Sequence, residues 1–294
     1  MLVLPGNASH IGQRSQQQDM FALSDFADND FIVHGGYLAV VADGIGGLLY
    51  GAEAAYIATS QFVESYLAKP SEITVSEALD NALATANQAV YAAAKENYCP
   101  EQMGTTLVAV VIHQNQLHWR TVGDSHLYLC RDGRLSQLNV DHNFARRLQV
   151  QVGDGLITQE QADNHPERYA LECFVGLNPL PEIARNQYPL PLLAGDKLLL
   201  CSDGVDGVLS ADEIIDCLHA TPMLAAEGLC DAVLKKNKLG QDNLTAVVLE
   251  YQVEDLTPIA ESARMVQGTG WQVKASGTGL LLLITYLLVT KYLA

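Results

Sequence analysis

One stretch organises the chain: Val40-Val41-Ala42-Asp43-Gly44-Ile45-Gly46-Gly47. Its apolar residues run directly into the carboxylate of Asp43, and three glycines follow within four positions. Apolar residues before glycines predict a buried strand that ends in a tight turn. The turn would hold Asp43 at the edge of a sheet, where its oxygens could bind a hard cation, and the glycines would let backbone and phosphate approach closely. Because Asp-Gly is also an ordinary turn dipeptide, this stretch alone also fits a plain turn.

Three later segments again place an aspartate on or near a glycine at one end of an apolar run. They are Gly123-Asp124-Ser125, Leu198-Leu199-Leu200-Cys201-Ser202-Asp203-Gly204 and Gly240-Gln241-Asp242-Asn243. Aspartates at the ends of different strands can converge on one point, as a site for more than one cation requires. Two further motifs complete an ordered set: Arg14-Ser15-Gln16-Gln17-Gln18-Asp19 upstream and Gly104-Thr105-Thr106 in between.

This ordered set resembles the metal-dependent protein phosphatases (the PPM or protein phosphatase 2C type, in its bacterial form) over roughly residues 6–250. The resemblance implies a protein serine/threonine phosphatase that hydrolyses phosphoserine and phosphothreonine by direct attack of a metal-activated water at a binuclear site. Two cations about 3.5–4 Å apart lower the pKa of such a water and stabilise the attacking and leaving oxygens. The expected partners are phosphorylated proteins, the substrates of a serine/threonine kinase. The alternatives are a catalytically weak phosphoprotein-binding module and a hydrolase of small phosphoesters.

The resemblance implies a role for each matching position. Asp43 would bridge two cations, and the carbonyl of Gly44 would bind one of them. Asp203 and Asp242 would complete the other site, with Asp19 acting through water. The expected cofactor is Mn²⁺ or Mg²⁺, because both prefer carboxylate, carbonyl and water ligands, and the sequence has no His/Cys cluster at zinc spacing.

A third cation, present in bacterial members of the resembled family, would lie between Asp124 and Asp203. Arg14 would clamp the substrate phosphate through its planar fork of donors. Each of these positions also has a plainer interpretation. Asp124 fits a hairpin turn, Asp203 and Asp242 fit the start or cap of a turn, and Arg14 and Asp19 fit a solvated surface.

Some positions depart from the pattern of the resembled family. Gln17 stands where Asn is usual, Gln18 where some relatives have Glu, and Ile45 where some eukaryotic relatives have a His proposed as general acid. His126 stands where the family normally has Arg, and it is expected either as a structural substitute or as a group that tunes a nearby pKa. The motif Gly104-Thr105-Thr106 is expected to pack near the site rather than to bind a ligand.

Composition narrows the class of protein. Lys and Arg total 17 against 34 acidic residues, and the formal net charge of −17 argues against nucleic acid as a partner, because such proteins neutralise phosphates with basic side chains. The six cysteines contain no Cys-x-x-Cys pair and are expected to be reduced thiols. The first residues are too few and too uncharged for a signal peptide, so the catalytic part is expected in the cytoplasm.

The pattern of apolar residues alternates between strand and helix. Short strands are expected within 6–42, and further strands at 105–113, 116–122, 127–130, 196–201 and 244–250. Helices are expected at 51–67, 75–97 with Thr74 as N-cap, 211–219 and 223–236. Asp132-Gly133 predicts a two-residue hairpin. The predicted fold class is α+β, with two packed antiparallel β-sheets flanked by pairs of helices (an α-β-β-α sandwich).

Changes in composition predict the domain organisation. Residues 1–253 are expected to form the phosphatase domain, in which 141–170 is a short helical insert at the place of the family's flap. Residues 254–274 are expected to be a polar linker, and 275–294 a C-terminal hydrophobic helix. Because 275–290 carries no charge and is apolar on all faces, we expect a transmembrane or membrane-anchoring segment, tail-anchored with the catalytic domain in the cytoplasm. The alternative is a helix that is buried or docks on a partner.

Overall fold

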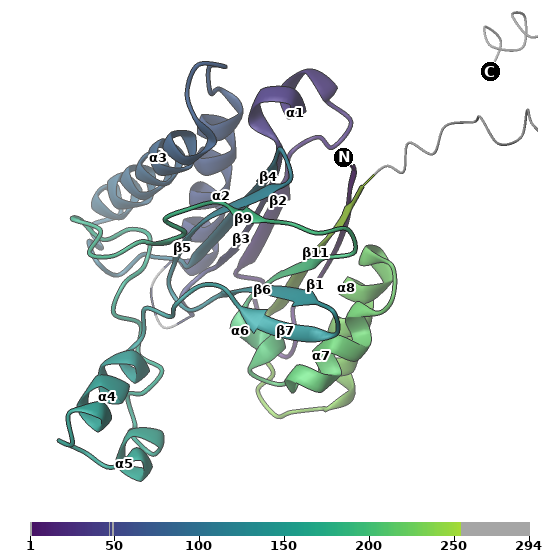
Figure 1. Cartoon of the computed structure of the whole chain (residues 1–294). Coiled ribbons are helices and arrows are strands. Elements are labelled where there is room, and N and C mark those ends of the chain that lie inside the picture. Colours follow the sequence, from purple (N-terminus) through teal and green to yellow (C-terminus); the bar gives the residue numbers. More distant parts are fainter. Residues whose placement is uncertain (1, 47, 49, 254–294) are drawn as a thin grey trace, which may run out of the picture. The chain divides into compact units, whose positions relative to one another are not determined.

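The strands form two antiparallel β-sheets in the computed structural model (Figure 1), which describes residues 2–46, 48 and 50–253. The first sheet has the spatial order β1 (Leu2–His10), β11 (Leu244–Gln252), β10 (Lys197–Cys201), β6 (His126–Arg131) and β7 (Arg134–Gln137). The second has the order β2 (Asp19–Leu23), β3 (Tyr37–Asp43), β4 (Leu107–His113), β5 (Gln116–Val122) and β8 (Ala184–Arg185), and β9 (Leu190–Pro191) also pairs with β5.

The two sheets pack face to face. Successive side chains of a strand point to opposite faces of its sheet, so a central strand contributes to two cores. In β3, Leu38 and Val40 belong to one buried cluster, whereas Ala39 and Val41 belong to another. Val247 of β11 lies in the same cluster as Ala39 and Val41, so this second cluster fills the space between the sheets.

Helices cover the outer face of each sheet (Figure 1). The pair α2 (Gly51–Leu67) and α3 (Val75–Glu96) packs on the second sheet, and Phe62 and Leu79 are fully buried there. The pair α7 (Ala211–Leu218) and α8 (Pro222–Lys235) packs on the first sheet, where Leu229 is fully buried. The predicted α+β class, with two antiparallel sheets and flanking helices, is therefore confirmed.

Two local predictions have different outcomes. Thr74 caps α3 as predicted, and its Oγ1 accepts a hydrogen bond of 3.2 Å from the backbone N of Glu77. In contrast, we expected only short strands within 6–42, and this is wrong at α1 (Asn29–Gly35). The Asp28 carboxylate accepts a bond of 3.0 Å from the backbone N of Phe31, so Asp28 is the N-cap of this helix.

The predicted hairpin between β6 and β7 is confirmed. Asp132 and Gly133 both have positive φ, at 52° and 71°, and they connect two directly paired strands. Positive φ at both central residues is the geometry that Asp-Gly favours in a two-residue hairpin turn.

The segment 141–170 contains two short helices, α4 (Phe144–Gly153) and α5 (Gln159–Asp163), which contact each other. Within the described part of the chain no helix is long and apolar enough to cross a membrane. The predicted linker 254–274 and the predicted hydrophobic helix 275–294 lie outside the described residues, as do residues 1, 47 and 49.

Candidate metal centre

Two of the predicted ligands, Asp19 and Asp43, face each other on neighbouring strands. Asp19 begins β2 and Asp43 ends β3, and the antiparallel register pairs them directly. Asp19 is buried, and Ser202 Oγ donates a hydrogen bond of 2.7 Å to its Oδ2. The same hydroxyl accepts a bond of 3.0 Å from the backbone N of Thr245. The side chain of Asp19 is thus held by the first sheet, whereas its backbone belongs to the second.

The backbone of Asp43 is held by two threonines. Its N donates to Thr106 Oγ1 at 3.0 Å, and its carbonyl oxygen accepts from Thr105 Oγ1 and from the Thr106 backbone N, both at 2.8 Å. The next residue, Gly44, lies so close to the start of α2 that a Cβ would be 2.3 Å from the carbonyl oxygen of Gly51. The threonines therefore support the turn that presents Asp43, in keeping with the packing role expected for their motif.

Three more of the predicted residues reach the same region. Asp203 opens the short helix α6 (Asp203–Asp206) directly after β10, and Asp242 lies just before β11. Asp124 lies in the turn between β5 and β6. Helix α6 packs tightly on the start of β11, because a Cβ at Gly204 would lie 1.9 Å from the carbonyl oxygen of Asn243.

The aspartate carboxylates raise one another's pKa values. Burial raises the pKa of Asp43 well above its usual value, and the charges of Asp19, Asp203, Asp124 and Asp242 raise it further. Burial likewise raises the pKa of Asp19 to about 6 and that of Asp124 to about 7. Asp203 keeps contact with solvent, yet partial loss of water and the charge of Asp242 raise its pKa as well. Asp19 on β2, Asp203 in α6, and Asp124 and Asp242 beside strand ends therefore lie near Asp43.

A cluster of carboxylates such as this one can bind cations, because the cations offset its negative charge. Oδ1 of Asp19 is buried without a hydrogen-bond partner in the structure, and carboxylate oxygens are the ligands that Mg²⁺ and Mn²⁺ prefer. Among the described residues, no three carboxylates, imidazoles or thiols lie close enough to enclose a metal ion by themselves.

Arg14 lies beside these aspartates, next to Asp242. Its Nη2 donates to Asp242 Oδ2 at 2.6 Å, and both side chains are nearly half exposed. A guanidinium carries five N–H donors, so this contact leaves other donors for a phosphate. The structure thus places Arg14 beside the aspartates and within a pair, rather than free on the surface.

The two glutamines next to Asp19 have defined contacts. Gln17 Nε2 donates to Ser9 Oγ at 3.0 Å, and its Oε1 accepts from the backbone N of Asp19 at 3.1 Å. The carbonyl oxygen of Gln18 accepts from the backbone N of Gly44 at 3.0 Å. Gln17 therefore supports the approach of the chain to Asp19 although it replaces the usual Asn.

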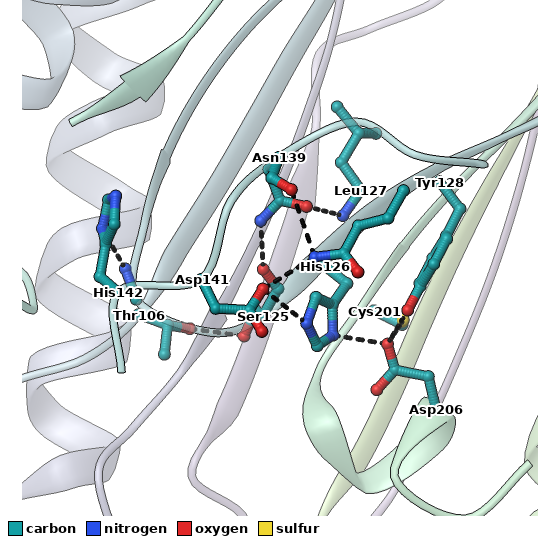
Figure 2. A network of polar contacts seen from close by, with 12 residues as sticks. Thr106, Ser125, His126, Leu127, Tyr128, Asn139, Asp141, His142, Cys201 and Asp206 are labelled. Atoms are coloured by element: carbon teal, nitrogen blue, oxygen red, sulfur yellow. Dashed lines mark hydrogen bonds and ion pairs between the residues drawn. The ribbon is translucent and has the colours of Figure 1, made fainter. Parts of the chain in front are cut away.

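His126 lies in a polar network that sequence analysis did not anticipate (Figure 2). Its Nδ1 forms an ion pair of 2.5 Å with Asp206 Oδ2, and its Nε2 forms one of 3.1 Å with Asp141 Oδ1. Tyr128 also donates to Asp206 Oδ2 at 2.8 Å. Burial lowers the pKa of His126, but its bonds to the two carboxylates outweigh this effect and raise the pKa to about 10. Asp206 and Asp141 had no signal in the sequence, because only the folded chain brings them to His126.

A cavity of about 590 Å³ opens beside the carboxylates. Asp124, Asp203 and Asp242 line it, together with Lys238 and with Tyr169 from the segment 141–170. The cavity is therefore bordered both by the predicted metal ligands and by the segment that we expected to act as a flap.

Known proteins are similar to this chain in sequence and in fold. A family model described as protein phosphatase 2C matches residues 7–235. The serine/threonine protein phosphatase PstP of Mycobacterium tuberculosis is 31% identical over 241 residues, which are 80% of this chain and 45% of that protein. The serine/threonine phosphatase stp of Listeria welshimeri is 28% identical over 240 residues, which are 81% of this chain and 91% of that protein.

A solved structure gives the same result. The crystal structure of the catalytic domain of serine/threonine protein phosphatase PstP in complex with two manganese ions has a TM-score of 0.66 and 29% identity, and the match covers 86% of this chain and 99% of that one. The chain spans less than half the length of the mycobacterial PstP protein, and nearly all of the Listeria protein. The match of the family model over most of the chain shows that the protein belongs to the protein phosphatase 2C family.

Proposed function

We propose that the protein is a metal-dependent serine/threonine phosphatase that hydrolyses phosphoserine and phosphothreonine in phosphorylated proteins. Four other aspartates lie near Asp43, and this grouping of carboxylates at the ends of strands carries the proposal. The names of the relatives support the class of substrate, and the manganese ions of PstP support the class of cofactor. The cavity of about 590 Å³ beside the carboxylates offers space for a phosphorylated side chain.

The carboxylates would bind two Mn²⁺ or Mg²⁺ ions, and a third by resemblance to bacterial members of the family. The residues that would hold the first two are Asp43, the Gly44 carbonyl, Asp203, Asp242 and Asp19 acting through water. Asp124 and Asp203 would hold the third. When bound, such cations lower the pKa of an attacking water and stabilise the charge on the attacking and leaving oxygens.

Arg14 would bind the phosphate of the substrate. Its guanidinium lies 2.6 Å from Asp242, and this contact fixes the direction of the remaining donors. Planar donors match two phosphate oxygens at once, which orients the phosphoryl group as well as attracting it.

Turnover by the full chain tests the proposal. A phosphothreonine peptide and a sugar phosphate are incubated with the protein in Mn²⁺, in Mg²⁺ and in EDTA. We expect hydrolysis of the peptide with either cation, much slower hydrolysis of the sugar phosphate, and none in EDTA. Full turnover in EDTA would refute the metal requirement, and preference for the sugar phosphate would make the protein a hydrolase of small phosphoesters.

We also propose that residues 275–294 anchor the protein to a membrane, with residues 1–253 on the cytoplasmic side. The support is the sequence alone: 275–290 contains no charged residue, and Leu280 to Ile284 is an unbroken apolar run.

A further inference from the structure

We propose that His126 is a positioning residue of the candidate metal centre: its imidazole, held between Asp206 and Asp141, fixes helix α6 and thereby the place of Asp203 relative to Asp124. This inference rests on the proposed function for its catalytic consequence, and on the geometry alone for its consequence for metal binding. The side chain of His126 is 15% exposed and that of Asp206 is 6% exposed, so their contact is largely shielded from water.

The backbone on either side of His126 is firmly held, so the imidazole extends from a fixed point (Figure 2). Asn139 Nδ2 donates to the carbonyl oxygen of Ser125 at 2.9 Å, and Asn139 Oδ1 accepts from the backbone N of Leu127 at 2.9 Å. Ser125 Oγ lies 2.7 Å from Thr106 Oγ1, which itself accepts from the backbone N of Asp43. The residues flanking His126 are therefore linked to the same threonine that supports Asp43.

Helix α6 needs such an external contact. It has only four residues, and its first residue is the predicted ligand Asp203 while its last is Asp206. At the first turn, Gly204 packs against β11, and at the other end the carboxylate of Asp206 accepts from Tyr128 and pairs with His126. Because His126 and Tyr128 project from the same face of β6, both anchor the helix to the strand that follows Asp124.

The second contact of His126, made through Nε2, is with Asp141 at the start of the segment 141–170. Asp141 is 32% exposed and also accepts a bond of 2.7 Å from Gln137 Nε2. The next residue, His142, donates its backbone N to the carbonyl oxygen of Gly123 at 3.0 Å. Asp141 is more exposed than Asp206, so the loss of its contact with His126 should disturb the centre less than the loss of the contact between His126 and Asp206.

Two substitutions of His126 test its contacts with Asp206 and with Asp141 separately. Asn places its amide nitrogen near the position of Nδ1, so His126→Asn keeps a donor for Asp206 and loses the one for Asp141. Gln places its amide nitrogen near the position of Nε2, so His126→Gln keeps the donor for Asp141 and loses the one for Asp206. The matched controls are His113→Asn and His113→Gln, since His113 bonds to the carbonyl of Val33 at the end of β4 away from Thr106.

Calorimetric titration with Mn²⁺ is the main readout, made on the full chain after removal of bound metal. We expect His126→Gln to weaken Mn²⁺ binding about 10- to 100-fold, the usual effect of losing a group that orients a metal ligand. His126→Asn should stay within about fivefold of the wild type, as befits the loss of a partly exposed pair. Both His113 variants should match the wild type.

Kinetics on a phosphothreonine peptide give a second readout. At subsaturating Mn²⁺ the kcat of His126→Gln should be low, and at saturating Mn²⁺ it should recover toward the wild type with KM unchanged. A purely structural role of His126 predicts instead that both variants lose Mn²⁺ affinity in proportion to their loss of Tm. Equal Mn²⁺ affinities of the two variants, or wild-type affinity of His126→Gln, would overturn the inference. A wild-type chain that binds Mn²⁺ but hydrolyses no phosphopeptide overturns the proposed function alone.

Discussion

Asp19 and Asp43 are directly paired across the ladder between β2 and β3, and the Asp19 carboxylate also accepts a hydrogen bond from Ser202, which directly follows β10 of the other sheet. The meeting point of the two sheets therefore contains two neighbouring carboxylates. Without a cation, their repulsion opposes folding, because buried like charges raise each other's pKa and resist ionisation. The predicted metal ligands should for this reason lower the stability of the metal-free protein while they enable its activity.

The first prediction concerns Asp43→Asn. The substitution keeps the shape of the side chain and removes a charge that offsets the cations, so phosphopeptide turnover should fall by more than about 100-fold, beyond the usual loss from an outer-shell change. In EDTA the same variant should be more stable than the wild type, with Tm higher by about 2–4 °C for each kcal/mol of relieved repulsion. Turnover assays and thermal melts in EDTA measure both effects.

The control for that variant is Asp28→Asn, at the N-cap of α1, which should leave turnover unchanged. An Asp43→Asn protein that retains turnover, or that melts well below the wild type in EDTA, would contradict the placement of Asp43 at the centre of the carboxylates.

The second prediction is the pH dependence of stability in EDTA. The pKa values of Asp19 and Asp124 are raised in the folded protein to about 6 and about 7, from an ordinary value of 3.8. Folding therefore favours the protonated acids. Their contribution to stability is fully present below pH 3.8 and is lost as the pH rises through about 6 and about 7. Each group adds a slope of at most about 1.4 kcal/mol per pH unit.

Urea unfolding in EDTA between pH 5 and 8 measures this loss, and Asp124→Asn should flatten the curve near pH 7. Saturating Mn²⁺ should reverse the trend, because the ligands must be deprotonated to bind a metal. A slope near pH 7 in EDTA that Asp124→Asn leaves unchanged would show that Asp124 is not buried among the carboxylates.

The third prediction concerns Arg14→Lys. Lysine offers a point charge in place of a planar fork, so the variant loses one of two paired bonds to phosphate. We expect KM for a phosphopeptide to rise about tenfold or more, as for the loss of a hydrogen bond to a charged group, with a smaller change in kcat. Arg147→Lys, at an exposed pair with Glu172, is the matched control and should behave as the wild type. Unchanged kinetics of Arg14→Lys would return Arg14 to the solvated surface.

The fourth prediction concerns the ion pair that joins Arg120 of β5 to Asp80 of α3. The guanidinium of Arg120 is almost fully buried, and it donates to Asp80 at 2.6 and 2.9 Å. Asp80→Ala leaves a buried cation with fewer partners and should lower the free energy of unfolding by about 2–3 kcal/mol, somewhat below the usual cost because the Asp80 side chain is partly solvated. Arg120→Met removes the charge itself and should cost less. Urea titration compares the two, and the reverse order would contradict this account.

The elements of the fold could largely be predicted because each has a local signal. Asp132-Gly133 specifies a hairpin turn through its own φ preferences, and Thr74 specifies the start of α3 through its own hydroxyl. Helix α1 was not predicted, because a cluster such as Asp28-Asn29-Asp30 favours a turn and an N-cap alike, and the burial of Phe31 decides between them.

The candidate site could be predicted in part for a similar reason. Asp43 and Asp203 follow apolar strands, so their place at a sheet edge is visible in the sequence. Asp206 and Asp141 carry no such signal. Their importance depends on His126 of β6, which reaches Asp206 only after β6 has paired with β10, and reaches Asp141 only after β6 has paired with β7.

The last prediction is that residues 275–294 hold the protein on a membrane. The uncharged stretch 275–290 would span only ~24 Å as a helix at ~1.5 Å per residue, against a bilayer core of ~30 Å. Lys291 can extend its ammonium to the interface, so that the following apolar residues lengthen the span, and the bilayer can thin locally. We therefore expect the full chain to pellet with membranes and to resist carbonate and high salt, whereas residues 1–253, which group into one compact unit, stay in the supernatant. Leu282→Lys with Leu283→Lys should release the full chain, because a charge near the centre of a bilayer is costly, whereas Leu282→Val with Leu283→Val should not. A full chain that remains in the supernatant as a monomer without detergent would show that the segment docks on protein instead.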